Sequence, residues 1–466
     1  MTTAGNAIPT AAGARPLVGH LLPLLRDPLG FLASLPEQGD VVQVRVGPTS
    51  VVILCDPQLM HEVLRNDRVF DKGGQMFDRY RESLGDGLGT CPHSRHRRQR
   101  RLVQPAFHPD RMPGYTEIIA TQTATQVSTW REGQVLDVMA ETTALAARNV
   151  AAALFSDALT PAARTQIAQD LSTIMAGIFR RMLTPPSLDR LPTPGTRRYF
   201  QACARLRRTI DDALAQRRAT ETDHGDLLSM LLSARDDDGH GLTDTEISDQ
   251  AVTFLMGGAE TVGCTLSWAL HMLTEHPDLE QRLHQEVDTV LAGRRAGHAD
   301  LPRLELTRRL VDETLRRYPP AWIVTRQVTA DTEISGHPVS AGTTVIYSPY
   351  LIHQRPDLYP AADHFDPDRW APERAQPPRQ GFIPFGTGAR KCIGEQFGLI
   401  ETTLALATIT SRWHLHPIPD GARVRPRLVA TLIPRGLRLK ATARTPAHPP
   451  AAPATAIPPR TIRDQP

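Results

Sequence analysis

Residues 385–394 read FGTGARKCIG and place Cys392 in a glycine-rich loop, two residues after Arg390. The stretch that follows, EQFGLIETTLALATI, has the apolar pattern of a helix. Two interpretations of the cysteine are open at this point. It is either a buried small side chain in a tight turn, or a thiolate held out on a loop to bind a metal ion.

The composition limits the classes of protein to which the chain can belong. With 466 residues it can form one large domain or two to three ordinary ones. A net charge of +3 gives no bulk argument for nucleic-acid binding. The five cysteines are scattered and form no C-x-x-C pair, so neither a disulfide framework nor a zinc site is indicated, and a reducing compartment is expected. No apolar run has the length of a signal peptide or a membrane span, so we expect a cytoplasmic protein without a membrane anchor.

The pattern along the chain is mainly helical, with a smaller β region. The stretch DVVQVRVGPTSVVILCD, residues 40–56, alternates valine with polar residues on either side of Gly47-Pro48 and predicts a hairpin. The central part of the chain is mostly helical, and short strands are expected after Pro320. Residues 1–15 are expected to be a flexible lead. Residues 445–466, with seven prolines, are expected to be a disordered tail.

The clearest helix follows Thr243. Thr243 and Glu246 have the spacing of a capping box, and an apolar helix then continues until His276-Pro277 stops it. This helix contains GGAET, residues 257–261. Two glycines in a helix interior cost about 1 kcal/mol each relative to alanine, so they need a reason. Close packing against another helix is the simplest one.

Five positions of the cysteine loop carry a family resemblance. Phe385, Gly388, Arg390, Cys392 and Gly394 fit the pattern F-x-x-G-x-R-x-C-x-G, and in this the chain resembles the cytochrome P450 family. The resemblance implies a mainly α fold with a smaller β region. It implies a single large triangular domain, here residues 16–444, with haem b between the long central helix and the cysteine loop. It makes Cys392 the axial ligand of the iron, where an electron-rich thiolate favours O–O cleavage.

Other motifs of that family follow at the expected places. Glu313 and Arg316 of ETLR lie on one helix face and by themselves would be a solvated surface pair. The resemblance joins them with Arg369 of FDPDRW in a buried structural network that braces the haem-loop side of the core, since a buried charge must be paired. In GGAET it implies a kink of the helix where O2 sits against it. Thr261 and Glu260 are then the alcohol and the acid that supply protons for O–O cleavage.

The resemblance also implies which residues hold the haem. In HSRHRRQRRLVQPAF, residues 93–107, His96 stands where the family has tryptophan and Arg100 where it has arginine. The expected cofactor contacts, with propionate binding by the basic residues, are His96, Arg100, Arg326, Arg390, Phe385, Gly386 and Gly394. Arg97, Arg98 and Arg101 have no expected haem contact. They form either a basic face that meets an acidic redox partner or an ordinary solvated surface.

The substrate is expected over the distal face of the haem. The positions that correspond to the family's substrate contacts are nearly all apolar, which suits a hydrophobic, uncharged small molecule. They are Phe77, Tyr80, Ile178, Phe179, Met182, Phe254, Leu255, Gly258, Ala259, Trp322, Ile323, Val324, Thr431 and Leu432. The stretches RRMLTPPSLDRLPTPGTRRY (180–199) and PPAWIVTRQV (319–328) are similar to bacterial members of the family that oxidise sesquiterpenes, of the pentalenene oxygenase and albaflavenone synthase kind.

The function that follows from the resemblance is hydroxylation of a terpene in secondary metabolism. O2 is the oxidant, and NAD(P)H-derived electrons arrive through a ferredoxin reductase and a ferredoxin. Oxidation of the alcohol to a ketone or an aldehyde stays open. The chain has no Rossmann glycine fingerprint and no P-loop, so no nucleotide-binding module is expected within it. A monomer is expected, with no nucleic-acid partner.

Several alternatives remain. One is a hydroxylase of another hydrophobic compound, such as a steroid, macrolide or fatty acid. A peroxide-driven or non-oxygenating haem-thiolate enzyme would lack the acid–alcohol pair, which Glu260-Thr261 speaks against. A haem-binding sensor without catalysis needs no Thr261 and no apolar pocket. A nucleic-acid binder built on residues 93–101 is disfavoured by the low net charge.

Overall fold

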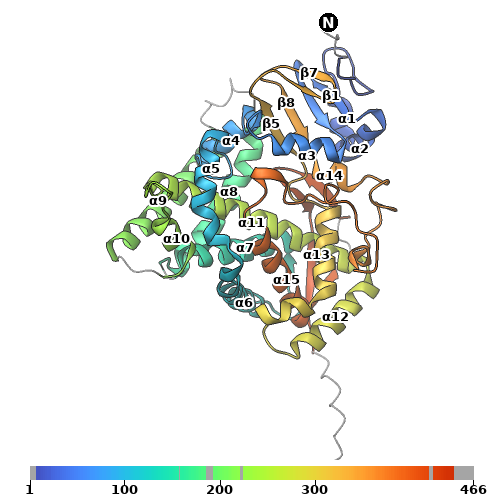
Figure 1. The fold of residues 1–466 in the computed structure, drawn as a ribbon. Helices are drawn as coiled ribbons and strands as arrows, with labels where there is room; N and C mark the ends of the chain where they lie inside the picture. The colour runs from blue at the N-terminus through green and yellow to red at the C-terminus, as the bar shows by residue number, and fades with distance from the viewer. Residues whose placement is uncertain (1–6, 157, 185–192, 221–223, 419–422, 446–466) are drawn as a thin grey trace, which may run out of the picture.

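The structure is a computed structural model that describes residues 7–156, 158–184, 193–220, 224–418 and 423–445. Most of the described chain is helical, and four small sheets account for the β structure. The sheet around β1 and β8, the helices α9 and α10, and the end that holds α6 and α12 form the corners of a roughly triangular outline (Figure 1). The expected fold class is confirmed. The expected tail, residues 446–466, lies outside the described residues.

The α-helices are α1 (Leu21–Arg26), α2 (Pro28–Ser34), α3 (Pro57–Arg65), α4 (Gly74–Leu84), α5 (His93–Val103), α6 (Met112–Ser128), α7 (Val138–Phe155), α8 (Pro161–Leu183), α9 (Pro194–Thr220), α10 (Leu227–Ser233), α11 (Asp244–Glu275), α12 (Pro277–Leu291), α13 (Glu305–Arg317), α14 (Pro349–His353) and α15 (Glu395–Arg412). Short 3₁₀ turns are η1 (Leu35–Gln38), η2 (Gln104–Phe107), η3 (Pro109–Arg111), η5 (His298–Arg303), η6 (Pro367–Trp370) and η7 (Gly388–Arg390). None of the helices in the described part is long and apolar enough to cross a membrane.

The strands are β1 (Val41–Val46), β2 (Thr49–Leu54), β3 (Phe70–Asp71), β4 (Val135–Asp137), β5 (Val324–Val328), β6 (Thr332–Ile334), β7 (His337–Val339), β8 (Thr344–Tyr347), β9 (Trp413–Pro417), β10 (Arg425–Leu428), β11 (Leu432–Arg435) and β12 (Arg438–Ala443). The largest sheet has the order β1-β2-β8-β5-β3, with β2 and β8 parallel and the other pairs antiparallel. The expected hairpin is confirmed, because β1 pairs with β2 in a register that places Gly47 and Pro48 in the turn between Val46 and Thr49.

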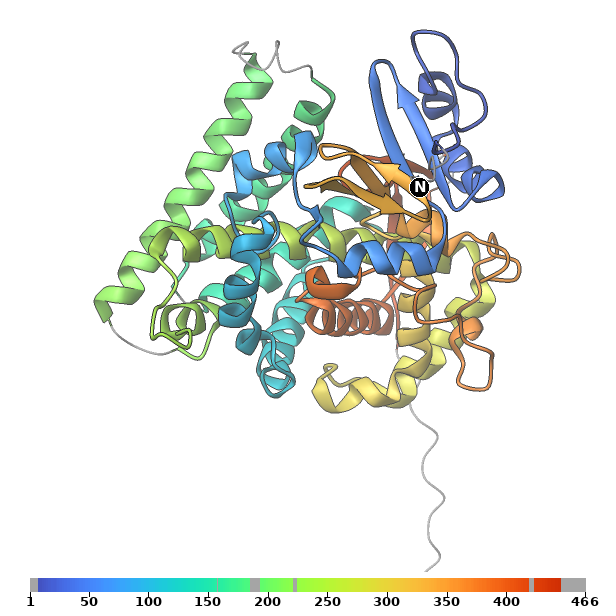
Figure 2. The same cartoon turned by 45° about the horizontal axis from the view of Figure 1, so that its top comes forward.

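Helix α11 organises the molecule. It crosses the middle of the fold, with α15 beneath it and α7 alongside (Figures 1 and 2). Its start is the predicted capping box, in which Thr243 accepts from the Glu246 N–H and Glu246 accepts from the Thr243 N–H. Its last residue, Glu275, stands directly before His276-Pro277, as the sequence predicts. Most of its residues are buried, so the helix is held by packing on all sides.

Residues 7–15, the described part of the expected flexible lead, contact the largest sheet. Ala11 is buried, and its N–H donates to the Gln43 carbonyl of β1 at 2.9 Å. The ring of His20, wholly buried, contacts the Ala11 and Arg45 carbonyls at 2.9 and 3.2 Å. The segment is polar enough to look unstructured, yet these backbone bonds fix it along the edge of the largest sheet.

Candidate active site

The cysteine loop is positioned by backbone contacts. The Cys392 N–H donates to the Phe385 carbonyl at 2.9 Å, which closes the loop just before α15. Gly388 has φ +70°, and a Cβ there would lie 2.5 Å from the Leu64 carbonyl oxygen at the end of α3. This glycine is therefore needed for packing against α3. Gly388 belongs to the motif that carries the family resemblance, and the geometry explains it by this close contact with the backbone of α3.

Cys392 differs from the other four cysteines in its surroundings. Cys55, Cys91 and Cys264 are buried, whereas the Cys392 side chain is exposed to an internal cavity of about 360 Å³ that it helps to line. Burial raises the pKa of the Cys392 thiol. The Gly394 N–H opposes that rise because it donates a hydrogen bond to the sulfur. A sulfur that lies deep in the fold, faces open space and is approached by an N–H at the start of a helix has the surroundings of a thiolate ligand.

The opposite wall of the cavity is one face of α11. Gly257, Gly258, Thr261 and Thr265 lie on it, at the spacing that keeps residues on one side of a helix. The Thr261 hydroxyl donates to the Gly257 carbonyl at 2.7 Å, a local bond that competes with the helix ladder. Thr261 thus faces the same cavity as Cys392, from the other side.

The two glycines of GGAET are there for different reasons. A Cβ on Gly258 would lie 2.6 Å from the Cγ2 atom of Val150 in α7, so Gly258 permits close helix packing. A Cβ on Gly257 would meet nothing within 4 Å, and Gly257 lines the cavity. Close packing therefore explains Gly258, whereas Gly257 leaves open space on the cavity side of the helix. The expected kink at this motif stays a prediction.

Basic side chains gather at one edge of the cavity. Lys72, His96, Arg100 and Arg390 line it, and Arg326 lies just behind, over the Tyr347 ring at 5.3 Å. Burial, together with Arg326 and Arg390, lowers the pKa of Lys72 to about 7. Burial, followed by the nearby cations with Arg390 first, lowers the pKa of His96 to about 3. Both shifts record a surplus of positive charge in a desolvated place.

Two carboxylates neutralise part of that positive charge. Arg390 donates to Asp67 at 3.0 Å and to Asp71 at 2.7 Å, and its side chain is 1% exposed. Two carboxylates already hold the Arg390 guanidinium, and its expected bond to a haem propionate stays a prediction. Arg100 donates to the Lys391 carbonyl at 2.6 Å and has no carboxylate partner among the described residues.

The residues fit a haem. Against the positive charges of Lys72, Arg100, Arg326 and Arg390 stand the two carboxylates of Asp67 and Asp71, which leaves a surplus that the two propionates of a haem would balance. The cavity between the Cys392 loop and α11 offers the sulfur on one face and the small residues Gly257 and Thr261 on the other. Phe385, Gly386 and Gly394, expected as macrocycle contacts, line the same cavity.

Glu260 lies on a different face of α11 from Thr261. It is 8% exposed and does not line the cavity, and it accepts a hydrogen bond from the Thr431 hydroxyl. Burial raises the pKa of the Glu260 carboxyl, and the Thr431 bond opposes the rise. The structure therefore brings Thr261 to the cavity and places its expected partner, Glu260, against the turn between β10 and β11.

The structure brings the expected buried network together. Arg316 and Glu313 are fully buried and joined by two hydrogen bonds of 2.8 and 2.9 Å. Arg369 approaches Glu313 at 3.7 Å, and Trp370 donates to the second oxygen of Glu313 at 2.9 Å. The buried Glu313 carboxylate and Arg316 guanidinium have hydrogen-bond partners within the protein, which fits a structural role.

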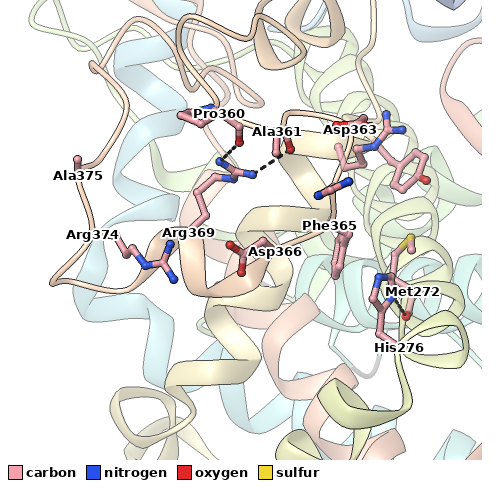
Figure 3. Close-up of a pocket in the computed structure, with 13 residues that line it drawn as sticks. Met272, His276, Pro360, Ala361, Asp363, Phe365, Asp366, Arg369, Arg374 and Ala375 are labelled. Carbon is pink, nitrogen blue, oxygen red and sulfur yellow. Dashed lines mark hydrogen bonds between the residues drawn. The ribbon is translucent and has the colours of Figure 1, made fainter.

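A second and larger cavity, of about 850 Å³, lies beside this network (Figure 3). Arg369 reaches across one side of it to the carbonyls of Pro360 and Ala361, and Met272 and His276 form the opposite side. Its lining includes several exposed side chains and no cysteine. Size alone would favour this cavity, but the smaller one holds the sulfur, the hydroxyl and the cationic edge, so we take the smaller one as the active site.

Only part of the expected substrate wall lines the active-site cavity. Phe254, Gly258 and Val324 do, and Phe254 packs edge-on against Phe107 with ring centroids 5.2 Å apart. Ile178 and Leu255 are wholly buried in the helical core, which accounts for their apolar character. Residues 185–192, inside one of the stretches that resembled terpene oxidases, lie outside the described residues.

Several residues of the site escaped the sequence analysis. Lys72 is one of the chain's three lysines, but no motif marks it. It donates to the Leu88 and Gly89 carbonyls at the cavity edge. Glu401 of α15 also lines the cavity, and it accepts from the Asn149 amide at 2.8 Å. A buried glutamate nine residues after the cysteine, in an otherwise apolar helix, was a signal that could have been used.

Two of the remaining arginines of α5 pair within the fold. Arg98 donates to Asp236 at 2.9 Å and to Glu246 at 3.2 Å, and Arg101 pairs with Asp237. These contacts hold α5 against the loop that precedes α11. Arg101 and Asp237 are both largely exposed, so this pair is compatible with a solvated surface, and a basic face for a partner stays a prediction.

The fold and the site together define a class of protein, a mainly helical protein with an internal cavity whose residues fit a haem. The sequence model described as cytochrome P450 matches residues 9–439. The chain is 46% identical over 439 residues to pentalenene oxygenase of Streptomyces avermitilis, covering 94% of this chain and 98% of that one. It is 45% identical over 413 residues to cyclooctat-9-en-7-ol 5-monooxygenase of Streptomyces melanosporofaciens, covering 88% of this chain and 90% of that one.

A solved structure agrees with these relatives. The cytochrome P450DA haem domain superposes with a TM-score of 0.84 at 26% identity, covering 95% of this chain and 99% of that one. The chain belongs to the cytochrome P450 family and is a monooxygenase of that family with a haem cofactor. The expected resemblance, including that to pentalenene oxygenase, is confirmed.

Proposed function

We propose that this enzyme hydroxylates a terpene in secondary metabolism. The reaction takes a C–H bond of the substrate, O2, two electrons and two protons, and gives the alcohol and water. The apolar wall of the active-site cavity carries the proposal, since Phe107, Phe254, Val150 and Leu227 line it and suit a hydrocarbon surface. The names of the two Streptomyces relatives add support, because both act on terpene compounds.

Each residue of the site has a proposed part. Haem, when bound, supplies the iron centre at which O2 is reduced. Cys392 would hold the iron through its sulfur, and Arg100, His96 and Lys72 would bind the propionates. The Thr261 hydroxyl, inside the cavity, transfers protons toward O2. Glu260 supplies these protons from the other face of α11. The apolar wall excludes water and sets which C–H bond of the substrate is presented.

We propose that a ferredoxin and a ferredoxin reductase supply the electrons from NAD(P)H, and that O2 is the oxidant. The chain lacks both a dinucleotide fingerprint and cysteine spacings for an iron–sulfur cluster, which supports an outside source. The monomeric state and the cytoplasmic location stay predictions.

A binding screen followed by turnover tests the substrate class. Pentalenene, a cyclic diterpene alcohol, a steroid, a fatty acid and a macrolide are titrated against the purified enzyme, and the haem spin-state shift is followed. We expect the terpenes to give the tightest shift, and turnover with isotopically labelled O2 to place one labelled atom in the product. Phe254→Leu should weaken terpene binding, while Phe200→Leu, on the exposed face of α9, should not. A response confined to steroid, fatty acid or macrolide contradicts the terpene proposal.

A further inference from the structure

Helix α11 presents two neighbouring stripes of residues. The first stripe, Gly257, Thr261 and Thr265, faces the active-site cavity. The second is displaced by one residue and contains Glu260, Cys264 and Trp268, again four residues apart. All three of these side chains bond to the turn between β10 and β11. A single helix thus connects the cavity with a turn that lies 171 residues further along the chain from Glu260.

The bonds between the second stripe and this turn are specific. Cys264 and Trp268 both donate to the Leu432 carbonyl, at 2.9 and 2.7 Å. Thr431, the residue before, donates its hydroxyl to the Glu260 carboxyl. All of these residues are buried: Glu260 is 8% exposed, Thr431 is 5% exposed and Leu432 is not exposed.

The β10–β11 turn is hydrogen-bonded to the segment that forms part of the cavity wall. The Leu432 N–H donates to the Pro320 carbonyl at 3.2 Å, and the Trp322 indole donates to the Val429 carbonyl at 3.1 Å. Pro320 lines the cavity, and so does its neighbour Ala321. The position of the Thr431 hydroxyl is therefore fixed by the same stretch of chain that bounds the space above the haem.

The buried Glu260 carboxyl depends on the hydrogen bond that it accepts from Thr431. The other titratable groups that sense its charge are the Tyr80 phenol of α4 and the Cys264 thiol, and its charge contributes to raising the pKa of each. No cationic side chain among the described residues contributes to the pKa of Glu260, which is raised by burial and lowered by the Thr431 bond. A buried carboxyl without a cation depends on its neutral hydrogen-bond donors to keep its place and its protonation equilibrium.

We propose that Thr431 is a positioning residue for proton delivery: its hydroxyl fixes the Glu260 carboxyl on the β10–β11 side of α11, one residue before Thr261 in the helix, and thereby links this turn to O2 reduction. The inference rests on the proposed role of Glu260 in supplying protons. In productive turnover two protons and two electrons accompany each O2 that gives alcohol and water. When proton supply is misplaced, the same two electrons and two protons leave as hydrogen peroxide, so NADPH is consumed without product.

The first test needs no substrate. The infrared band of the protonated Glu260 carboxyl is followed against pH in the haem-loaded enzyme, and Glu260→Gln identifies the band. We expect Thr431→Val, which removes the donor at nearly equal volume, to move the titration upward by about one pH unit. Thr431→Ser restores a hydroxyl and should leave the titration near that of the wild type. An unmoved titration in Thr431→Val overturns the proposal.

The second test is a double-mutant cycle on coupling, the share of NADPH electrons recovered in product, with hydrogen peroxide as the other readout and pentalenene as the substrate. We expect Thr431→Val to lower coupling by about fivefold or more, Thr431→Ser to retain it, and Thr431→Val to add nothing in the Glu260→Gln background. Thr410→Val is the matched control, since Thr410 is equally buried but donates only within α15.

The outcomes separate the two claims. If Glu260→Gln leaves coupling unchanged, both the proton role of Glu260 and the inference are overturned. If Glu260→Gln uncouples but Thr431→Val does not, or if Thr431→Val is as harmful without Glu260 as with it, the inference alone is overturned. If pentalenene is not turned over, the terpene proposal fails, and the infrared titration still decides the inference.

Discussion

Replacing Arg316 by glutamine removes the centre of the buried network. The Arg316 guanidinium donates to both carboxylate oxygens of Glu313, at 2.8 and 2.9 Å. It also donates to the carbonyls of His353, Ala362 and His364, at 2.9, 2.9 and 3.1 Å. Arg316→Gln leaves the Glu313 carboxylate in the core with Arg369 at 3.7 Å as its remaining charged partner.

The magnitude follows from burial. Breaking a buried ion pair by removal of one partner costs about 3–5 kcal/mol, because the other charge stays uncompensated. The matched control is Arg308→Gln on the same helix, α13. Arg308 pairs with Asp312 at 3.0 Å, but its side chain is 48% exposed. Exposed pairs at this spacing contribute about 0.3–0.5 kcal/mol.

The assay is denaturant unfolding followed by the helical circular dichroism signal, with the free energy of unfolding taken by linear extrapolation. We expect Arg316→Gln to lose several times more stability than Arg308→Gln. Equal losses at the two positions would refute the reasoning that Glu313 and Arg316 brace the core through a desolvated charge pair.

Three further predictions concern the cavity walls. Thr261→Ala should keep substrate binding and raise hydrogen peroxide formation per NADPH, and unchanged coupling would remove Thr261 from proton delivery. Gly258→Ala should destabilise the fold through its contact with Val150, whereas Gly257→Ala should be neutral or stabilising by up to about 1 kcal/mol, and equal effects in thermal unfolding would contradict the packing argument. Burial raises the pKa of Glu401 from 4.5 to about 8, so its contribution to stability is present at low pH and is lost as pH rises through about 8. Glu401→Gln should therefore become more stable relative to the wild type as pH increases. Parallel curves of unfolding free energy against pH for the two proteins would contradict the raised pKa of Glu401.

Local signals explain what the sequence could predict. The turn at Gly47-Pro48 and the capping box of Thr243 and Glu246 depend on residues close together in the chain, and both were correctly predicted. The Cys392 loop could be predicted for the same reason, because its motif lies within residues 385–394. The pairing of Glu313 with Arg316 is also local, but its burial is not, and only the resemblance suggested it.

The missed features all depend on distant chain segments. The carboxylates that hold Arg390, Asp67 and Asp71, are 323 and 319 residues away from it. Thr431, expected as a substrate contact, is instead a partner of Glu260, and no spacing rule could have joined the two. The contacts of the N-terminal segment with β1 were missed because they are backbone bonds, which polar side chains do not reveal.

The central claim is that Cys392 binds the haem iron through its thiolate. A carbon monoxide difference spectrum of the reduced enzyme tests it most directly, with Cys203→Ser, at a cysteine outside the cavity, as the control. We predict the red-shifted Soret band of a thiolate-ligated haem in the wild type and in Cys203→Ser, and its loss in Cys392→Ser. A wild-type spectrum without that band, or a Cys392→Ser spectrum that keeps it, would contradict the assignment.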